Sequence, residues 1–306
     1  MKYVSVVVLL LFFFNASIAQ KVKPALNLKK GSTYYMISNA NSTIVQTLNS
    51  QENTLNLTFV FKMAFKVIDV LDTTYNMEVS YQAINMKIQA GTQSVEIDSK
   101  KADTADVPSS FMAAMMNKPF NIILTKSGKV KSVQNIEKII SVVFDGFPKI
   151  DSVKKSQLKK QFLQSFGADA FRGSLEMGTA IFPSKVVSRD DKWTINTKLE
   201  APTKANVETV YQLTDITNDY YLIHGDGTLT TDSNSKPGEI NGMPMIYKLN
   251  GSLITDIKID KNTGWINEVK LKQIMKGSIE IQDNPQLPGG MTIPMTFNTD
   301  VLTTDK

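Results

Sequence analysis

The chain has 306 residues, a formal net charge of +5 at pH 7, one histidine and no cysteine. The absence of cysteine excludes disulfide-stapled folds, thiolate catalysis and lipid attachment at a cysteine, and a single histidine excludes most transition-metal sites. The small positive surplus is nearly all lysine, with Arg172 and Arg189 as the only arginines, so the guanidinium forks that read phosphate and guanine are scarce and we expect no nucleic-acid partner.

The first predicted element is a secretory signal peptide over residues 1–19. Lys2 precedes an uncharged apolar run at 4–14, and small residues follow up to Ala19. A membrane anchor is the alternative, but the run is much shorter than the roughly 20 residues that cross a bilayer. We expect cleavage after Ala19, a periplasmic, extracellular or cell-surface location without a lipid anchor, and no transmembrane segment in the mature chain.

Three long strands are predicted next. Residues 55–67 alternate between apolar and polar side chains, over a length well above the usual strand of about five or six residues. One side of this strand carries Leu55, Leu57, Phe59, Phe61, Met63, Phe65 and Val67. The alternation resumes at Tyr75 and slips by one residue before Ile84, which predicts a β-bulge. With residues 32–48 before them, these segments predict a three-stranded meander.

The following segments change from loop to helix. Residues 91–108 lose apolar content and gain charge, which predicts a surface loop. Ser109 or Ser110 is then expected to cap a short apolar helix before Pro119. We expect the methionines of this helix to fill the core, with a soft cavity as the alternative.

The stretch 118–140 changes its apolar spacing from two residues to a helical repeat. Ser127-Gly128 predicts the tight turn of a hairpin, and Asn135 is expected to cap the next helix. The apolar face of that helix carries Ile136, Ile139, Ile140, Val143 and Phe144. Two more helices are predicted, from 151 to 166 and from 168 to about 177.

The middle one of these three helices is rich in lysine. The lysines Lys154, Lys155, Lys159 and Lys160 are set against the apolar residues Leu158, Phe162, Leu163 and Phe166. A solvated helix face is the expected role for the lysines, and contact with anionic head groups or an acidic partner is the alternative.

The remainder of the chain returns to strands. They are predicted within 190–201, 208–231, 251–260, 265–281 and 295–304, with turns at 225–227 and 262–264. The order of strands, helices and strands predicts an α+β fold, in which a large curved antiparallel β-sheet resembling a half-barrel is covered by an inserted group of helices. We expect residues 20–306 to form a single β-rich domain with a helical insertion at about 135–178.

The residues that usually carry catalysis are scarce. His224 lies in a strand pattern, no Gly-x-Ser-x-Gly elbow occurs, and we expect this histidine to make a local hydrogen bond. Ser152 and Lys155 match Ser-x-x-Lys, but the partner motifs of acyl-serine enzymes are missing. The acidic loop near Asp232 lacks calcium-loop spacing, and the Asp-Asp pair at 190–191 is expected to form a turn. We therefore predict no catalytic residue, no metal site, no cofactor and no enzymatic activity.

Six segments carry a resemblance to a known family. They are LNLKKGSTYYM, FKMAFKVIDV, YNMEVSY, NKPFNIILTKSGKVKSVQNIEKI, IFPSKVVSRDDKWTI and IDKNTGWINEV. Over nearly the whole mature chain they resemble uncharacterised exported proteins of Bacteroidota with a domain of unknown function, a resemblance that implies no catalytic residues. The chain departs from that pattern at Arg189-Asp190-Asp191, where a glycine and an acid are expected before the tryptophan. A looser architectural similarity is to periplasmic lipoprotein and lipid carriers, whose curved half-barrel holds acyl chains beneath helices.

Two functions of different class follow from this sequence. A long strand with aromatic inner residues needs a cover, and a loose cover leaves an apolar pocket between sheet and helices. The residues expected to line that pocket are Phe59, Phe61, Met63, Phe65, Ile140, Phe144 and Phe162. The first hypothesis is a non-catalytic exported envelope protein that binds a lipid or another apolar ligand there. The alternative is a structural or protein-interaction module that meets another envelope protein through open strand edges or the lysine-bearing helix.

Overall fold

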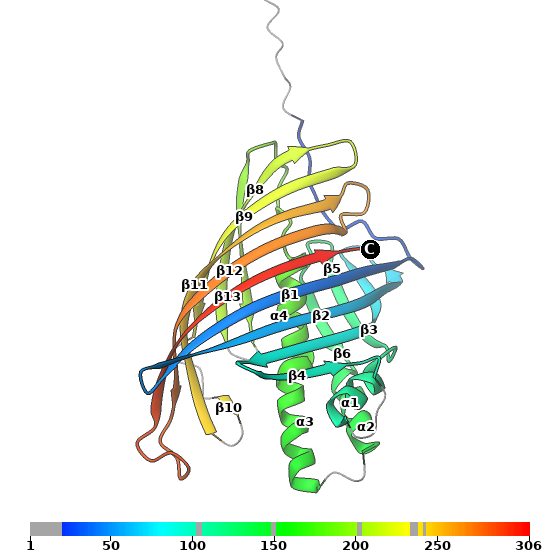
Figure 1. Cartoon of the computed structure of the whole chain (residues 1–306). Helices are drawn as coiled ribbons and strands as arrows, with labels where there is room; N and C mark the ends of the chain where they lie inside the picture. Colours follow the sequence, from blue (N-terminus) through cyan, green and yellow to red (C-terminus); the bar gives the residue numbers. More distant parts are fainter. Residues whose placement is uncertain (1–19, 102–105, 148–150, 201–203, 233–237, 241–242) are drawn as a thin grey trace, which may run out of the picture.

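Figure 1 shows a computed structural model, which describes residues 20–101, 106–147, 151–200, 204–232, 238–240 and 243–306. The predicted signal peptide lies outside the described residues. Most of the described chain belongs to one β-sheet. Among the helices that the structure describes, none combines the length and the apolar character needed to cross a membrane.

Thirteen strands and four helices are present in the described residues. The strands are β1 (Thr33–Leu48), β2 (Gln51–Val70), β3 (Thr74–Ala90), β4 (Gln93–Asp98), β5 (Phe120–Thr125), β6 (Val130–Gln134), β7 (Lys192–Leu199), β8 (Ala205–Ile216), β9 (Tyr220–Thr231), β10 (Gly238–Ile240), β11 (Met243–Asp260), β12 (Ile266–Ile281) and β13 (Met291–Thr304). The helices are α1 (Val107–Met115), α2 (Ile136–Asp145), α3 (Ser152–Phe166) and α4 (Ala168–Thr179).

The sheet brings the two ends of the chain together at its centre. Its strand order is β6-β5-β3-β2-β1-β13-β12-β11-β9-β8-β7, with β4 paired to β3 and β10 paired to β11. The pairings are antiparallel, as between β1 and β13 and between β11 and β12. The predicted meander of β1, β2 and β3 is present, with a register shift at the expected bulge between the partners of Lys62 and Met63. The predicted class, α+β with a large curved antiparallel sheet, is confirmed.

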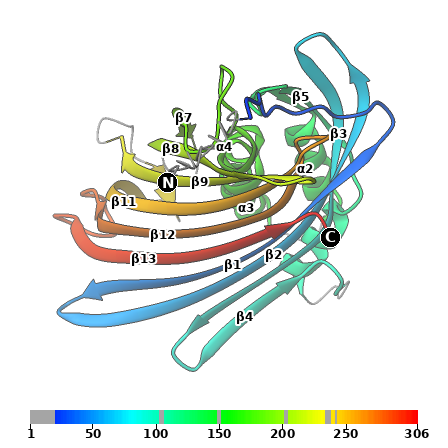
Figure 2. The same ribbon diagram turned by 90° about the horizontal axis from the view of Figure 1, so that it is seen from above.

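The sheet bends strongly, and the helices lie on its concave side. Figure 2 shows β1, β2, β12 and β13 running on past the helices toward the end that carries the turn between β1 and β2. Long strands with apolar residues at every second position form one continuous inner face, because side chains alternate between the two faces of a sheet. The helices therefore cover only part of that face.

Helix α4 occupies the opening between the two edge strands β6 and β7. The backbone N–H of Val130 donates to Glu176 Oε1 at 2.7 Å, and the Thr179 hydroxyl donates to Gly128 O at 2.6 Å. Gly128 has φ +80°, in the left-handed region, and an added Cβ would lie 1.7 Å from Thr179 O, so only glycine fits this turn. On its other side α4 packs on β7. The helix thus joins two strands that do not pair with each other.

Two strand expectations are wrong. Residues 91–108 are not only a loop, because β4 lies within them and pairs with β3 across a tight turn. The glycines at 225 and 227 do not form a turn but lie inside β9. A Cβ on Gly225 would come within 2.8 Å of the Tyr211 ring, so glycine is needed here for the close approach of an aromatic side chain.

Two expected helix caps also differ. The N-cap of α1 is Asp106, whose carboxylate accepts from Ser109 N at 3.1 Å, and neither Ser109 nor Ser110 holds that position. Asn135 precedes α2 as predicted, but it has φ +72° and its side chain makes no capping hydrogen bond. Both differences concern backbone conformation at a single residue, which propensity alone does not determine.

Candidate functional site

The strand register determines which side chains share the concave face. Phe65 of β2 pairs with Tyr34 of β1, and Ser38 of β1 pairs with Thr303 of β13. Because side chains alternate, the odd-numbered residues of β2 lie on the same face as the even-numbered residues of β1. The buried residues of these strands occupy those positions, so this is the face that the helices cover.

One part of the concave face, the covered half, is a filled core. Its buried residues include Met36, Met63, Phe65, Val67, Tyr75, Met77, Val79, Ile257 and Ile259. Phe65 is 0% exposed, and its ring centroid lies 5.3 Å from that of Trp265. The indole N–H of Trp265 donates to Tyr35 O at 2.9 Å, and the hydroxyl of Tyr75 donates to Leu26 O at 2.8 Å. The polar atoms of these large side chains are thus satisfied inside the core.

The other part, the open half, is lined by side chains that are half-buried. Its residues are Leu55, Leu57, Phe59 and Phe61 of β2, Ala40, Ser42 and Ile44 of β1, Phe297, Thr299 and Val301 of β13, and Leu271, Gln273 and Met275 of β12. The hydroxyls of Ser42 and Thr299 bond to each other at 2.8 Å, which leaves a largely neutral and apolar lining. This strip continues the core beyond the helices.

The concave face of the long strands carries no charge in the described residues. Along β1, β2, β11, β12 and β13, every concave position that the register assigns is apolar or neutral. The convex positions of β2 and β12, in contrast, hold Lys62, Lys66, Lys270, Lys272 and Lys276. A half-exposed position can hold a charged side chain, because part of the side chain still meets water. The absence of charge from the half-exposed concave positions of these strands is therefore not explained by burial alone.

Helix α3 has an incompletely covered apolar side. None of its residues is buried, although it carries Phe162 and Phe166, whose rings stack with centroids 4.4 Å apart. Phe166 reaches Tyr81 on the concave side of β3, with ring centroids 6.4 Å apart. The helix packs on α2 and α4. Its apolar side therefore faces the concave side of the sheet.

The predicted lining residues of β2, α2 and α3 differ in burial. Met63, Phe65, Ile140 and Phe144 are buried, and Phe144 packs on Phe111 of α1 with ring centroids 4.2 Å apart. Phe59, Phe61 and Phe162 are half-buried and pack at the margin of the core. The lining residues of β12 and β13 are not among those predicted from the sequence, although the alternation within 265–281 contains that signal.

His224 lies on the convex face, away from the lining. Its Nδ1–H donates to Asp256 Oδ1 at 2.7 Å, and Nε2 lies 3.4 Å from Asp226 Oδ2. The hydrogen bond to Asp256 raises the pKa of His224 above its usual value, and the nearby charge of Asp226 adds to the effect. The described residues contain no group of three or more side chains placed to hold a metal ion.

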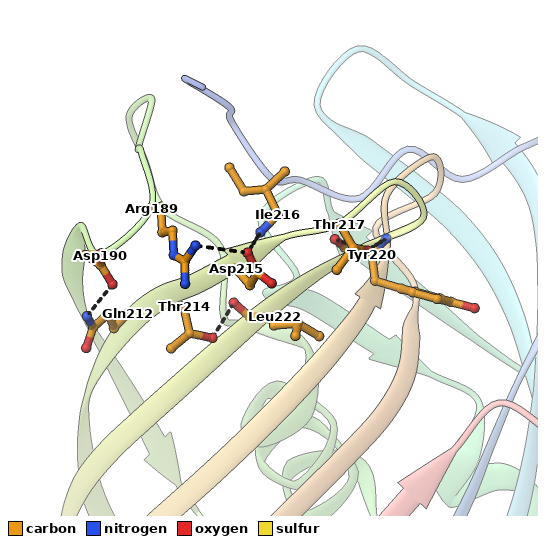
Figure 3. Close-up of polar contacts among 9 residues, drawn as sticks. All are labelled: Arg189, Asp190, Gln212, Thr214, Asp215, Ile216, Thr217, Tyr220 and Leu222. Carbon is orange, nitrogen blue, oxygen red and sulfur yellow. Dashed lines mark hydrogen bonds and ion pairs between the residues drawn. The ribbon is translucent and has the colours of Figure 1, made fainter. Parts of the chain in front are cut away.

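A polar cluster at one end of β8 and β9 closes turns (Figure 3). Asp190, with φ +70°, accepts from Gln212 Nε2 at 3.3 Å, and Arg189 lies 3.6 Å from the carboxylate of Asp215. The hydroxyl of Thr217 accepts from Tyr220 N at 2.9 Å. These contacts fix loop geometry, in agreement with the predicted turn at 190–191.

Comparison with known proteins identifies a family. A model of a family of unknown function, DUF6263, matches residues 72–266. The resemblance expected from the sequence is thereby confirmed as regards a family of unknown function, while the Bacteroidota origin and the export stay predictions. No curated protein matches the chain.

The similarity of the chain to solved structures is distant. Lipovitellin, in a structure concerned with its lipid–protein interactions, is similar at 10% identity with a TM-score of 0.45, over 92% of this chain and 25% of the lipovitellin chain. An outer membrane channel from Pseudomonas putida F1 has 6% identity and a TM-score of 0.26, over 90% of this chain and 97% of the channel. The translocator domain of the autotransporter NalP from Neisseria meningitidis has 6% identity and a TM-score of 0.22, over 91% of this chain and 90% of that domain. The chain spans about a quarter of the lipovitellin chain.

Proposed function

The chain belongs to the family of unknown function DUF6263, and we propose that it is a non-catalytic exported protein of the cell envelope that binds a lipid-like ligand on the open half of its concave face. The half-buried, uncharged lining of that half carries the proposal. This lining continues the filled core along β2, from Phe65 to Phe59, and consists of the same kind of apolar side chains. Unlike the core, it is not covered by the helices.

The energetics favour an apolar occupant. Each Å² of apolar surface removed from water contributes roughly 25 cal/mol, so a hydrocarbon chain laid along the strip gains from every side chain that it covers. Contiguous apolar surface that stays open in a monomer usually marks a binding site. Charges at half-exposed positions such as Leu57 or Met275 would improve solubility in the free protein, and their absence from the described concave positions fits selection for an apolar ligand.

The side chains that line the open half are suited to binding a ligand rather than to catalysing a reaction. Most are hydrocarbon side chains, and the hydroxyls of Ser42 and Thr299 are bonded to each other. The same holds at the border of the two halves, where the hydroxyls of Ser38 and Thr303 are 2.7 Å apart.

The proposed export rests on the predicted signal peptide at 1–19, and fractionation of the host cell is its test.

Native mass spectrometry of the protein purified from its host envelope tests the binding function. We expect the native mass to exceed the denatured mass by that of one or more lipid molecules, and extraction with organic solvent to remove the difference. Re-addition of a fluorescent fatty acid should restore a complex. Identical native and denatured masses, together with no uptake of the fatty acid by the delipidated protein, would contradict the proposal.

A second candidate function rests on the edge of β4 that pairs with no other strand among the described residues. This strand pairs with β3 on one side, and Val95 within it is 57% exposed. Open strand edges add strands from partner proteins, so an interaction module of the envelope is the alternative. Ser94 of β4 pairs with Gln89, so its side chain lies on the convex face, away from the apolar strip. Replacing Ser94 by proline should then abolish a cross-linked envelope partner while leaving lipid content unchanged; an unchanged cross-linking pattern would argue against this function.

A further inference from the structure

The helix that stands over the concave face offers a place for an ionic head group. α3 spans Ser152–Phe166 and carries four lysines and no acid. Lys154 and Lys160 are exposed, whereas Lys155 and Lys159 are half-buried. The four lysines are therefore not equivalent, and a solvated helix face accounts only for the exposed pair.

Helical geometry places the half-buried pair on the apolar side of α3. Lys155, Lys159, Phe162 and Phe166 follow one another at spacings of three or four residues, which is one stripe of an α-helix. Phe166 at the end of the stripe contacts Tyr81 on the concave face. The stripe thus begins with the two lysines at the start of α3 and ends with the aromatic residues next to the sheet. Figure 1 shows that α3 extends beyond β4. The two lysines therefore lie at the end of α3 that is remote from the contact with Tyr81.

A surface depression of about 650 Å³ adjoins Lys159. Ser156, Leu163 and Gln164 of α3 line it together with the start of α4 and Glu200 at the end of β7. Hydroxyl and amide groups beside an ammonium group provide the donors that a phosphate or carboxylate requires.

The acidic residues of this depression already have partners. Glu137 Oε1 accepts from Ala168 N at 2.9 Å, Asp169 lies 3.8 Å from Arg172, and Glu200 lies 3.7 Å from Lys204. Lys160 is engaged as well. Within the described part of the chain, neither Lys155 nor Lys159 forms an ion pair. Each of these two side chains is half-buried and has no counter-charge among the described residues, so an anionic ligand would supply one.

We propose that Lys155 and Lys159 bind the anionic head group of an amphiphile whose hydrocarbon chain lies on the open half of the concave face. The inference rests on the proposed lipid-binding function and adds the chemical class of the ligand: an acyl chain that ends in a phosphate or carboxylate. Along the stripe, Phe162 and Phe166 lie between the two lysines and the contact with Tyr81, so these rings would meet the hydrocarbon chain next to the head group.

Binding of two short-chain lipids tests the ligand class. Dodecanoate and dodecanol share their hydrocarbon chain and differ in head-group charge, and each is titrated below its critical micelle concentration or solubility limit onto the delipidated full chain. We expect the anionic lipid to bind about tenfold more tightly, since a charge-assisted contact is worth roughly a factor of ten or more in affinity. K155Q/K159Q should lose that preference and keep the affinity for the uncharged alcohol.

A matched variant controls for net charge. K138Q/K154Q removes two exposed lysines from α2 and α3 and should retain the preference for the anionic lipid. Equal binding of the two lipids by the unaltered protein, or equal loss of preference in both double variants, would overturn the head-group site while leaving lipid binding intact. Failure of the protein to bind either lipid would instead overturn the proposed function on which the site depends.

Discussion

The covered and open halves of the concave face are built from the same strands and differ in what lies above them. In β2, Phe65 is 0% exposed and packs against Trp265, whereas Phe59 is half-buried and has Phe61 as its aromatic neighbour, with ring centroids 5.3 Å apart. One alternating sequence thus serves as core at one end and as an uncovered apolar surface at the other. Apolar patterning fixes the face that a residue occupies, and the helices decide whether that face is core or binding surface.

Truncation of the two phenylalanines should separate the halves most clearly. Phe65→Ala removes a fully enclosed ring and should lower the free energy of unfolding by about 4 kcal/mol, because the cavity cannot collapse. Phe59→Ala removes a ring that already meets water and should cost about 1 kcal/mol. Urea titration followed by tryptophan fluorescence measures both. Equal losses would mean that the open half is as well packed as the covered half.

The contact of α4 with β6 should have the next largest effect. Glu176→Ala leaves Val130 N without its 2.7 Å acceptor in a part-buried site and should cost about 2 kcal/mol. Glu176→Gln keeps a carbonyl acceptor and should recover most of that loss. If both substitutions were equally destabilising in urea, the acceptor at this position would not be what holds the helix between the edge strands.

A charge on the open half should affect binding more than stability. Leu57→Asp places a carboxylate on the apolar strip and should weaken binding of a fluorescent fatty acid by about tenfold or more, since the buried charge would lose its water. Asn56→Asp adds the same charge one residue away on the convex face and serves as the control. If both variants bound the fatty acid as tightly as the unaltered protein, the open half would not be the surface that binds it.

The smallest predicted effect concerns the pKa of His224 on the convex face. The hydrogen bond to Asp256 raises the pKa of His224 in the folded protein, so the protonated ring stabilises the fold. This stabilisation is fully present below the unfolded value near 6.5 and is lost as the pH rises through the raised folded value. Asp256→Asn should lower the pKa of the single histidine, measured by its ring proton NMR signals, and Asp226→Asn should lower it less. An unchanged pKa in Asp256→Asn would contradict the assigned cause.

Local patterns predicted much of the fold but less of the site. The alternation of β2, the Gly128 turn and the repeat of α3 depend on neighbouring residues, and each lies where the sequence predicted it. The glycine at 225 was misread because its role, room for the Tyr211 ring, depends on a residue in another strand. The lining residues of β2 follow from the alternation within one strand, whereas those of β12 and β13 depend on the pairing of β13 with β1, two segments far apart in the chain.

Photo-cross-linking tests the central claim, that the open half of the concave face holds an acyl chain, most directly. A fatty acid with a diazirine on its chain would be bound to the delipidated protein, irradiated, and located by peptide mass spectrometry. The account predicts adducts with a period of two along β2, on Leu55, Leu57 and Phe59, and none on Asn56 or Thr58. Adducts on the alternate residues, or confined to the outer surface of the helices, would contradict it.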